Sequence, residues 1–502
     1  MMLRLAAILS LAIVVGPAVG AEPVDLQEKM KKLIDGAEPS VVSLVVSHNP
    51  KHTIPRANRP WELGDYRSPA IAGFRGRQPD RDKLDLADAR NAADHTLGSG
   101  VVLDEREGLI LTCYHLIDGA RKIYARGVGN AGSYADIVAG DARSDLAVLR
   151  LRTPMPKLKA AKLADVRTHD APRAKATVTR GQWIIAIAHP FAAGAADGRA
   201  TASWGIVGNV SRRSPLPPGA EDIRPGYLHQ YGSLIQTDAR ANLGSSGGGL
   251  FNLDGELIGL LSAAAGVAGS EAAGGYAIPM DAIYRGVVDV LRRGGEVEYG
   301  FLGVAPDRLS ADPRRPGLYV STVTPGSPAA LAGIEPNDLI QSVNGRPIQE
   351  DADLFLLIGG ALAGKDVTLT VISQNQSREV RATLAKFQHP YPHIASVPPP
   401  AYSGLRVDYS SLMVQQLIGP GARMGLNLNG VIVRDLEPNS RAEAAFRQLP
   451  IGQGRWLITK VNGTPVANPP AFHAAAAKSQ TLRLTVVNAM DYTGTERTVT
   501  LP

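Results

Sequence analysis

Short apolar runs separated by Gly and Asp turns recur between residues 98 and 280, and this pattern restricts the possible folds more than any other feature. The clearest runs lie at residues 100–103, 109–112, 147–151 and 183–187. Runs of this length and spacing are typical of antiparallel barrels or sandwiches. The 53 Gly and 36 Pro residues also favour short strands joined by turns over helical bundles. We therefore expect a mainly β fold.

The segments around this strand-rich region have different patterns. Residues 24–33 and 281–293 show the apolar spacing of helices, and the second of these helices would close the domain. Residues 49–95 are rich in Arg, Asp and Pro and lack a clear period, which predicts a long surface insertion. Its charges are those of a solvated loop, with a binding patch as the alternative.

The first 21 residues have the pattern of a secretory signal. Arg4 supplies a positive charge, residues 5–15 are almost entirely apolar, and residues 18–21 are small enough for cleavage. The apolar run is shorter than the about 20 residues that span a bilayer as a helix. We therefore expect cleavage and export to the periplasm or the extracellular space, rather than a membrane anchor.

Charge and cysteine content argue against several classes of protein. The 502 residues include 53 basic and 47 acidic side chains, and this small excess does not indicate a nucleic-acid-binding protein. No Gly-Lys-Ser/Thr phosphate loop occurs, so nothing suggests ATP-driven unfolding, and we expect no cofactor. Cys113 is the only cysteine, so no intramolecular disulfide can form.

The sequence Gly-Ser-Ser-Gly-Gly-Gly at residues 244–249 has the composition of a loop that carries a nucleophile. A serine hydroxyl needs a base to accept its proton and N–H donors to stabilise the oxyanion that forms on attack. Glycines around Ser246 allow a tight turn that aims two N–H groups at one point. We expect these donors to be the N–H groups of Gly244 and Ser246.

Partners for such a serine lie upstream. His115 is expected at a strand end, and Asp145 at the start of an apolar strand. A histidine oriented by a carboxylate can serve as the base, and the order His, Asp, Ser is that of chymotrypsin. Cys113 lies two residues before His115, so a thiol nucleophile is an alternative, although a small buried thiol is the commoner finding.

These motifs together resemble the HtrA/Deg family of serine proteases. The matching segments are spread over most of the chain after the signal, at residues 97–102, 112–115, 144–148, 235–239, 244–249, 252–259 and 275–279. The resemblance implies a chymotrypsin/trypsin-like double β-barrel with Ser246 as the nucleophile, His115 as general base and then acid, and Asp145 orienting the imidazole. It also implies that Leu261, Ser262 and Ala263 pair with the substrate backbone.

Several positions depart from the family pattern. Ser245 stands where the family usually has Asn, and Cys113 belongs to a pair that replaces the usual polar pair before the histidine. His189 also replaces an Asn. It could bind a metal or substrate, but a structural loop histidine is the commoner case, and we expect no metal. Residues 211–231 are longer than usual, and regulation by this loop is a hypothesis.

The C-terminal part contains an internal repeat that resembles two PDZ-like α+β domains. Residues 317–345 and 430–463 each have a strand, a turn, a short helix, a strand and an Asn-Gly turn. PDZ domains capture a peptide C-terminus by strand addition and a glycine-containing loop. The loop of the first copy would be Phe301, Leu302, Gly303 and Val304, and its poorer counterpart in the second copy is residues 402–407. The second copy could instead pack against neighbouring subunits.

The sequence thus predicts a signal peptide (1–21), a trypsin-like protease domain (22–294), a first PDZ domain (295–386), a Pro-rich linker (387–401) and a second PDZ-like domain (402–502). The resemblance implies an ATP-independent endopeptidase for unfolded or damaged exported proteins, assembled as a homotrimer or higher oligomer. A polypeptide-binding chaperone or scaffold with little proteolytic activity is the alternative. A digestive trypsin relative is disfavoured by the single cysteine and the repeat.

Overall fold

The computed structural model describes most of the chain, namely residues 23–48, 85–88, 95–129, 131–168, 176–191, 197–213, 227–262, 275–307, 316–389, 391–413, 429–447, 449, 456–488 and 495–501. The predicted signal peptide and most of the predicted insertion lie outside these residues. No helix among the described residues has the length and apolar content needed to cross a bilayer.

The first barrel follows an N-terminal helix, α1 (Pro23–Ala37), and a short 3-10 helix, η1 (Glu38–Ser40). Its strands are β1 (Val41–His48), β2 (Thr96–Asp104), β3 (Leu109–Cys113), β4 (Ala120–Arg126), β5 (Gly132–Asp141) and β6 (Leu146–Leu151). They are ordered β5-β4-β1-β2-β3-β6, and pairing of β5 with β6 closes the barrel. The short helix α2 (Tyr114–Ile117) directly follows β3.

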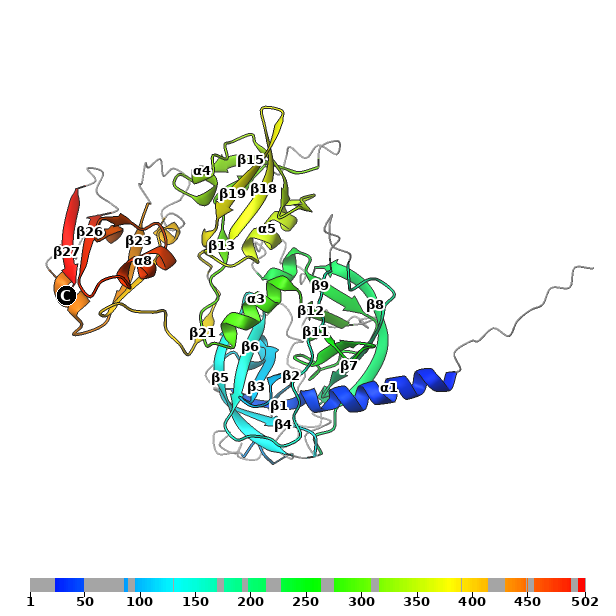
Figure 1. Ribbon diagram of the computed structural model, residues 1–502. Coiled ribbons are helices and arrows are strands. Elements are labelled where there is room, and N and C mark those ends of the chain that lie inside the picture. Colours follow the sequence, from blue (N-terminus) through cyan, green and yellow to red (C-terminus); the bar gives the residue numbers. More distant parts are fainter. Residues whose placement is uncertain are drawn as a thin grey trace, which may run out of the picture.

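The second barrel is also closed and six-stranded, in the order β10-β11-β12-β9-β8-β7. Its elements are β7 (Trp183–Ala188), β8 (Thr201–Arg212), the 3-10 helix η7 (Leu228–Tyr231), β9 (Leu234–Thr237), β10 (Gly249–Asn252), β11 (Leu257–Ser262) and β12 (Gly275–Pro279). Helix α3 (Ala282–Leu291) begins at Asp281, whose side chain accepts hydrogen bonds from the N–H groups of Ile283 and Tyr284. It packs back onto β5 and β6 of the first barrel (Figure 1).

A third unit follows α3 and contains a six-stranded sheet with two helices. Its elements are β13 (Gly300–Phe301), β14 (Val304–Pro306), β15 (Leu318–Val323), α4 (Pro328–Leu331), β16 (Leu339–Val343), β17 (Arg346–Pro347), α5 (Asp351–Gly359), β18 (Asp366–Ser373), β19 (Gln376–Thr383) and β20 (Ala385–Lys386). The strand order is β14-β15-β16-β18-β19, with β17 paired to β16, while β13 pairs with β20.

The last unit repeats this plan. It contains β22 (Leu405–Tyr409), β23 (Val431–Leu436), α7 (Arg441–Phe446), β24 (Trp456–Val461), β25 (Thr464–Pro465), α8 (Pro469–Ala476), β26 (Leu482–Asn488) and β27 (Glu496–Leu501). The order β22-β23-β24-β26-β27, with β25 paired to β24, matches the third unit strand for strand. Ser327 and Ser440 also cap the corresponding helices α4 and α7.

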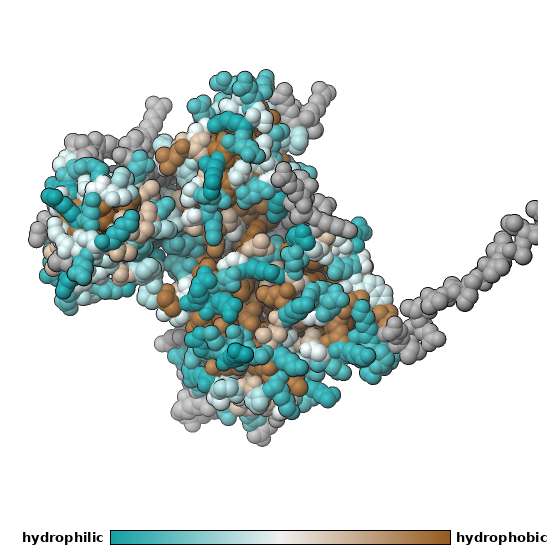
Figure 2. All heavy atoms as spheres, in the orientation of Figure 1, coloured by the Kyte–Doolittle hydropathy of each residue, from teal (hydrophilic) through white to brown (hydrophobic). Residues whose placement is uncertain are grey.

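Each C-terminal unit has its own hydrophobic core, whereas the two barrels share one. In Figure 1 the last unit lies to the side of the barrels and the third unit lies above them. Figure 2 shows hydrophilic residues over most of the visible face of the last unit, with hydrophobic residues mainly over the central part of the molecule.

The Pro-rich segment predicted as a linker forms a strand, β21 (His393–Ala395), which pairs with β5 of the first barrel. Strand β4 pairs only with residues 132–135 of β5, so the side of β5 at residues 139–141 is open to another strand. Strand β21 occupies that place beside Pro392, and proline is tolerated at the edge of a sheet. The segment therefore joins the C-terminal units to the protease barrels by backbone hydrogen bonds.

Candidate active site

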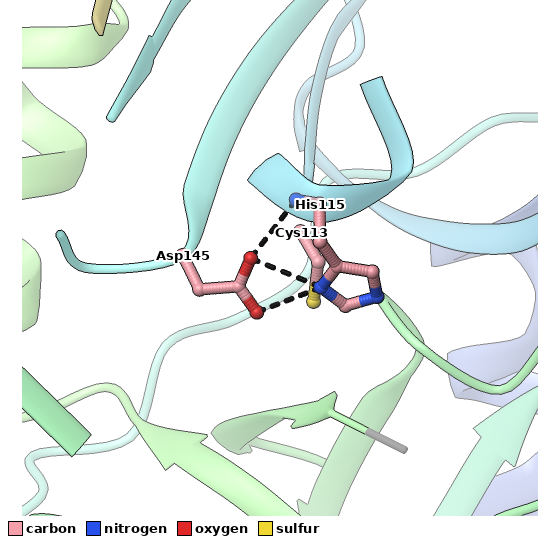
Figure 3. A group of neighbouring side chains, drawn as sticks. All are labelled: Cys113, His115 and Asp145. Atoms are coloured by element: carbon pink, nitrogen blue, oxygen red, sulfur yellow. Dashed lines mark hydrogen bonds and ion pairs between the residues drawn. The ribbon is translucent and has the colours of Figure 1, made fainter. Parts of the chain in front are cut away.

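His115 and Asp145 come together at one end of the first barrel. His115 lies in α2, directly after β3, and Asp145 ends the turn between β5 and β6. The Nδ1 atom of His115 lies 3.0 Å from Oδ1 and 2.9 Å from Oδ2 of Asp145 (Figure 3). The backbone N–H of His115 also donates to Oδ1 of Asp145, at 3.0 Å. One carboxylate therefore fixes both the ring and the backbone of the histidine.

The turn that ends at Asp145 is stabilised by hydrogen bonds between its own residues. The carboxylate of Asp141 accepts hydrogen bonds from the N–H of Ser144 at 2.8 Å and from its hydroxyl at 2.6 Å. Asp145 has φ +57°, a left-handed conformation that Asp tolerates better than most residues. Its carbonyl accepts the N–H of Tyr114 at 3.0 Å, so the backbone of Asp145 is held from the same side as its carboxylate.

The electrostatics keep Asp145 ionised. Asp145 is 5% exposed, and burial alone would raise the pKa of its carboxyl group. The neighbouring His115 outweighs burial, so the pKa is lowered. Because the carboxylate binds Nδ1, the other ring nitrogen, Nε2, points away from Asp145 (Figure 3). This is the orientation in which an imidazole can accept a proton from a hydroxyl.

The serine loop between β9 and β10 is closely packed. Ser246 is 5% exposed, and its carbonyl accepts the N–H of Ser99 at 2.8 Å. A Cβ added to Gly247 would lie 2.0 Å from the carbonyl oxygen of Ser99, and Gly247 has φ +83°. Gly244 has φ +91°, and a Cβ there would lie 2.8 Å from the carbonyl oxygen of His189. Both positions therefore require glycine, as the sequence pattern predicts.

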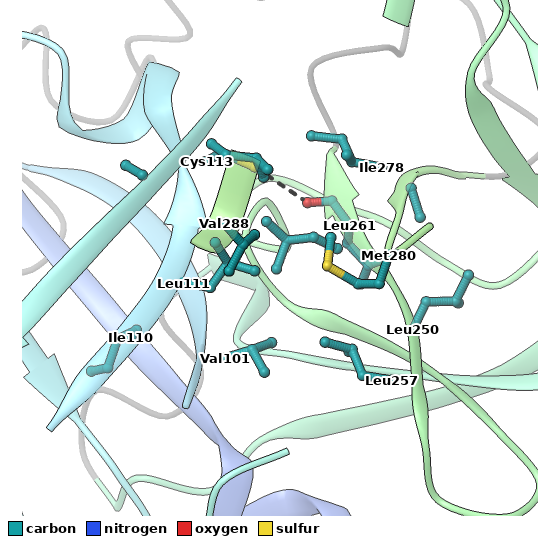
Figure 4. Packing of buried hydrophobic residues seen from close by; sticks show 14 of the residues in the cluster. Val101, Ile110, Leu111, Cys113, Leu250, Leu257, Leu261, Ile278, Met280 and Val288 are labelled. Carbon is teal, nitrogen blue, oxygen red and sulfur yellow. Dashed lines mark hydrogen bonds between the residues drawn. The ribbon is translucent and has the colours of Figure 1, made fainter. Parts of the chain in front are cut away.

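Cys113 lies at the junction of the two barrels. Its sulfur donates to the carbonyl of Leu261 at 3.5 Å, and both residues belong to the shared core (Figure 4). Burial, reinforced by the negative charge of Asp145, raises the pKa of the thiol well above its usual value. Since the nucleophile of cysteine chemistry is the thiolate, this environment opposes the alternative of a thiol nucleophile and favours a buried packing role.

Cys113, His115 and Asp145 each offer a ligand atom within 4.8 Å of the others. Metal ions bind the thiolate rather than the thiol. The raised pKa of Cys113 opposes metal binding by this cluster, and so does the hydrogen bond between Nδ1 of His115 and Asp145.

Leu261, the first residue of the predicted substrate strand, lies inside β11. Leu261 is fully buried, its N–H donates to Gly248 and its carbonyl accepts the N–H of Gly247, at 2.7 and 2.8 Å. The expectation that Leu261 pairs with substrate is therefore wrong, because its backbone closes the serine loop. Ser262 ends β11 beside it, and Ala263 lies outside the described residues.

His189 is not placed to touch substrate. It is fully buried, and burial lowers the pKa of its ring to about 4, so the ring is neutral near pH 7. Its backbone N–H donates to the hydroxyl of Ser99 at 2.9 Å. These contacts agree with the structural interpretation of His189. The sequence singled out residues 97–102 only as a family motif, and nothing in it indicated the role of Ser99.

The predicted peptide-binding residues of the third unit form the end of β13, a turn and the start of β14. Leu302 is 2% exposed, and its carbonyl accepts the N–H of Ala329 at 2.9 Å. Gly303 has φ +88°, and a Cβ there would lie 2.2 Å from that of Ser327. Strand β14, which begins at Val304, is at the edge of its sheet.

The comparisons with known proteins agree with this geometry. The family model described as "Trypsin-like peptidase domain" matches residues 98–260, and that described as "PDZ domain" matches residues 300–384. The fold and the matched domains define the class of the protein: it is a trypsin-like serine protease with an attached PDZ domain.

Relatives identify the family more closely. The chain is 30% identical over 387 residues to a "Probable periplasmic serine endoprotease DegP-like" of Pseudomonas fluorescens, covering 75% of this chain and 74% of that one. It is 32% identical over 307 residues to the "Periplasmic pH-dependent serine endoprotease DegQ" of Escherichia coli, covering 60% and 62%. Among solved structures, "HtrA-type protease AlgW with tripeptide" covers 72% of this chain and 98% of its own, at 22% identity and a TM-score of 0.47.

This chain belongs to the DegP-like family of periplasmic serine endoproteases. The predicted HtrA/Deg resemblance and the mainly β double-barrel fold are confirmed. The comparisons match a PDZ domain at residues 300–384, so a second PDZ-like domain stays a prediction. The matching strand order of the last unit favours it.

Proposed function

We propose that this protease hydrolyses peptide bonds of unfolded or damaged exported proteins, without ATP, through an acyl-enzyme on Ser246. The observation that carries the proposal is the bond of the Asp145 carboxylate to Nδ1 of His115, with the Ser246 carbonyl fixed to the same barrel by Ser99. The sequence contains no Gly-Lys-Ser/Thr phosphate loop, so nothing in it suggests ATP-driven unfolding.

In the proposed reaction the hydroxyl oxygen of Ser246 attacks the substrate carbonyl carbon while Nε2 of His115 accepts the hydroxyl proton. The resulting oxyanion is stabilised by the N–H groups of Gly244 and Ser246. When the C–N bond breaks, His115 returns the proton to the leaving amine, and an ester to Ser246 remains. Water, deprotonated by His115, then attacks this ester, and the carboxylic acid product leaves as the Ser246 hydroxyl is restored.

The backbone around the serine supports this choice of oxyanion donors. A trans peptide unit points its C=O and N–H in opposite directions. The carbonyl of Leu243 accepts the N–H of Phe191 at 2.8 Å, and the carbonyl of Ser245 accepts the N–H of Gly248 at 2.9 Å. These bonds turn the N–H groups of Gly244 and Ser246 away from those two partners. We also propose that Ser262, at the end of β11, pairs with the substrate backbone.

The third unit is proposed to capture a peptide C-terminus at Phe301, Leu302, Gly303 and Val304. Strand β14 is an edge strand, so an added peptide strand can pair with it, and the preceding turn contains the glycine that such a loop needs. Binding of one peptide as the free acid and as the C-terminal amide tests this. Equal affinity for the two would contradict carboxylate capture.

A homotrimer or higher oligomer is proposed from the family resemblance, and sedimentation equilibrium tests it.

Replacement of Ser246 by Ala tests the main proposal. We expect the variant to lose degradation of casein and labelling by a serine-directed phosphonate, while its thermal unfolding stays close to that of the wild type. Degradation that persists in the variant, or labelling mapped to another residue, would remove Ser246 from its role. If the wild type suppresses aggregation but never cleaves unfolded substrate, the protein acts as a chaperone or scaffold instead.

A further inference from the structure

Ser99 connects the first barrel to the serine loop through its N–H and its hydroxyl. It lies in β2 and is fully buried. Its N–H donates to the carbonyl of Ser246 at 2.8 Å, and its hydroxyl donates to the carbonyl of Gly244, also at 2.8 Å. The same hydroxyl accepts the N–H of His189 at 2.9 Å, and the carbonyl of Ser99 accepts the hydroxyl of Thr112 at 2.7 Å.

The two carbonyls that Ser99 holds belong to alternate peptide units of the loop. The unit joining Gly244 to Ser245 is fixed at its other end, because the N–H of Ser245 donates to Asn242 at 2.9 Å. The unit joining Ser246 to Gly247 is likewise fixed by the N–H of Gly247, as described above. The N–H groups proposed as oxyanion donors lie in the peptide units immediately before each of these. Their directions therefore depend on the two units that Ser99 anchors.

The direction of the Ser99 hydroxyl proton is set by its surroundings. A hydroxyl has one proton to donate and two lone pairs that accept. The N–H of His189 occupies one lone pair, and the carbonyl of Gly244 lies at hydrogen-bond distance to receive the proton. Since the site is fully buried, loss of the hydroxyl would leave both partners without this bond.

We propose that Ser99 is a positioning residue for the oxyanion hole, acting through the backbone of Gly244 and Ser246 without touching the substrate. This inference rests on the proposed function, because it assumes that Ser246 is the nucleophile. A group with this role stabilises the transition state more than bound substrate, so its loss should lower kcat and leave KM nearly unchanged.

Ser99→Ala tests the proposal, because it removes the hydroxyl and keeps the N–H bond to Ser246. Loss of a direct oxyanion donor typically costs about 10²–10³ in kcat, so for an indirect role we expect a loss of about tenfold to a hundredfold. KM for a peptide substrate should change by less than about threefold. Affinity for a peptide boronic acid, whose tetrahedral adduct places an oxygen in the hole, should fall in parallel with kcat.

Ser43→Ala is the matched control. Ser43 lies in β1 directly opposite Ser99, is 1% exposed, and its hydroxyl has no hydrogen-bond partner within the described part of the chain. We expect wild-type kcat and boronate affinity for this variant. Thermal unfolding of both variants shows whether a loss of activity comes from a loss of fold.

Two results would overturn the inference. One is a Ser99→Ala variant with wild-type kcat and boronate affinity. The other is a folded Ser99→Ala variant in which KM rises and kcat stays constant. Either result, obtained while Ser246→Ala abolishes activity, contradicts the role of Ser99 alone. If Ser246→Ala remains active, the proposed function itself fails.

Discussion

Asp145 combines a strained backbone with a buried charge, and both are directed at His115. Its φ of +57° turns the carboxylate back toward α2, where it accepts bonds from the ring and the backbone N–H of His115. The positive charge that an imidazole gains during the reaction would be stabilised by this ionised carboxylate. The pKa of Asp145 is lowered because His115 outweighs burial, so the group stays charged well below neutral pH.

Asp145→Asn removes the negative charge of the side chain and nearly keeps its shape. The amide can no longer stabilise an imidazolium, and its NH₂ group favours the wrong tautomer of His115, so we expect kcat to fall by about 10³–10⁴-fold. KM should change little, because Asp145 does not contact the substrate. The measurement is steady-state hydrolysis of a peptide substrate. Asp136→Asn, at an exposed carboxylate paired with Arg152, is the control and should keep full activity. A loss of less than tenfold in the Asp145 variant would contradict the assigned role.

At the scale of elements, β21 determines how the C-terminal units are attached to the barrels. The N–H of Ser396 donates to Val138 and the N–H of Ala142 donates to Pro392, both at 3.2 Å. Hydrogen-bonded pairs alternate along an antiparallel ladder, so the pair of Ile394 with Gly140 is also hydrogen-bonded, whereas that of Ala395 with Ala139 is not. Two prolines in neighbouring positions should therefore have different effects.

Ile394→Pro removes a ladder N–H, and Ala395→Pro removes one that points away from β5. In the Ser246→Ala background, which avoids self-digestion, we expect Ile394→Pro to speed amide exchange of residues 138–142 by about tenfold or more. This corresponds to a loss of at least about 1.4 kcal/mol of local stability. Ala395→Pro should exchange like its parent. Equal exchange in the two variants would show that β21 does not hold this edge. The measurement is hydrogen–deuterium exchange with mass spectrometry.

The sequence predicted the elements whose signals are local. Periodic apolar runs located β2, β3, β6 and β7, and the glycines at 244 and 247 marked the serine loop. It did not predict β21, because a Pro-rich segment resembles a linker until its distant partner β5 is known. The positions of Leu261 and Ser99 could not be predicted either, because both depend on contacts between distant segments. Leu261 closes the serine loop, and Ser99 anchors it.

At the scale of the whole molecule, a partly buried ionic network joins the third and last units. Lys386 is 7% exposed, and its Nζ lies 2.8 Å from Glu296, 3.0 Å from Glu298 and 3.1 Å from Asp408. Arg434 of the last unit lies 2.9 Å from Glu296 and 3.3 Å from Asp408. The network therefore contains three carboxylates and two cations drawn from both units, and Lys386 and Arg434 each pair with carboxylates of both units.

Removal of the central cation should loosen this junction. Lys386→Met leaves Glu298 without this cation and leaves Glu296 and Asp408, of which Asp408 is buried, with Arg434 alone. Breaking a buried pair from one side typically costs about 3–5 kcal/mol. We expect an increased radius of gyration by small-angle scattering and a separate, earlier unfolding transition for the last unit. Lys460→Met, in an exposed pair with Glu496, is the control and should cost no more than about 1 kcal/mol. An unchanged scattering profile for Lys386→Met would contradict a docking role.

The contribution of Glu296 to stability should depend on pH in a defined direction. Burial opposes ionisation of Glu296, but Lys386 and Arg434 outweigh it and lower the pKa of Glu296 from 4.5 to about 2. A carboxyl group whose pKa is lower in the folded state stabilises the fold above its unfolded pKa, and this contribution is lost as the pH falls through the folded pKa. This contribution of Glu296 is about 3 kcal/mol at pH 7, and it is lost between about pH 4.5 and 2. The difference in unfolding free energy between the wild type and Lys386→Met should therefore be largest near neutral pH and shrink as acid protonates the carboxylates. Urea unfolding at several pH values measures this difference, and a difference that grows on acidification would show that the carboxylates are not the partners that Lys386 stabilises.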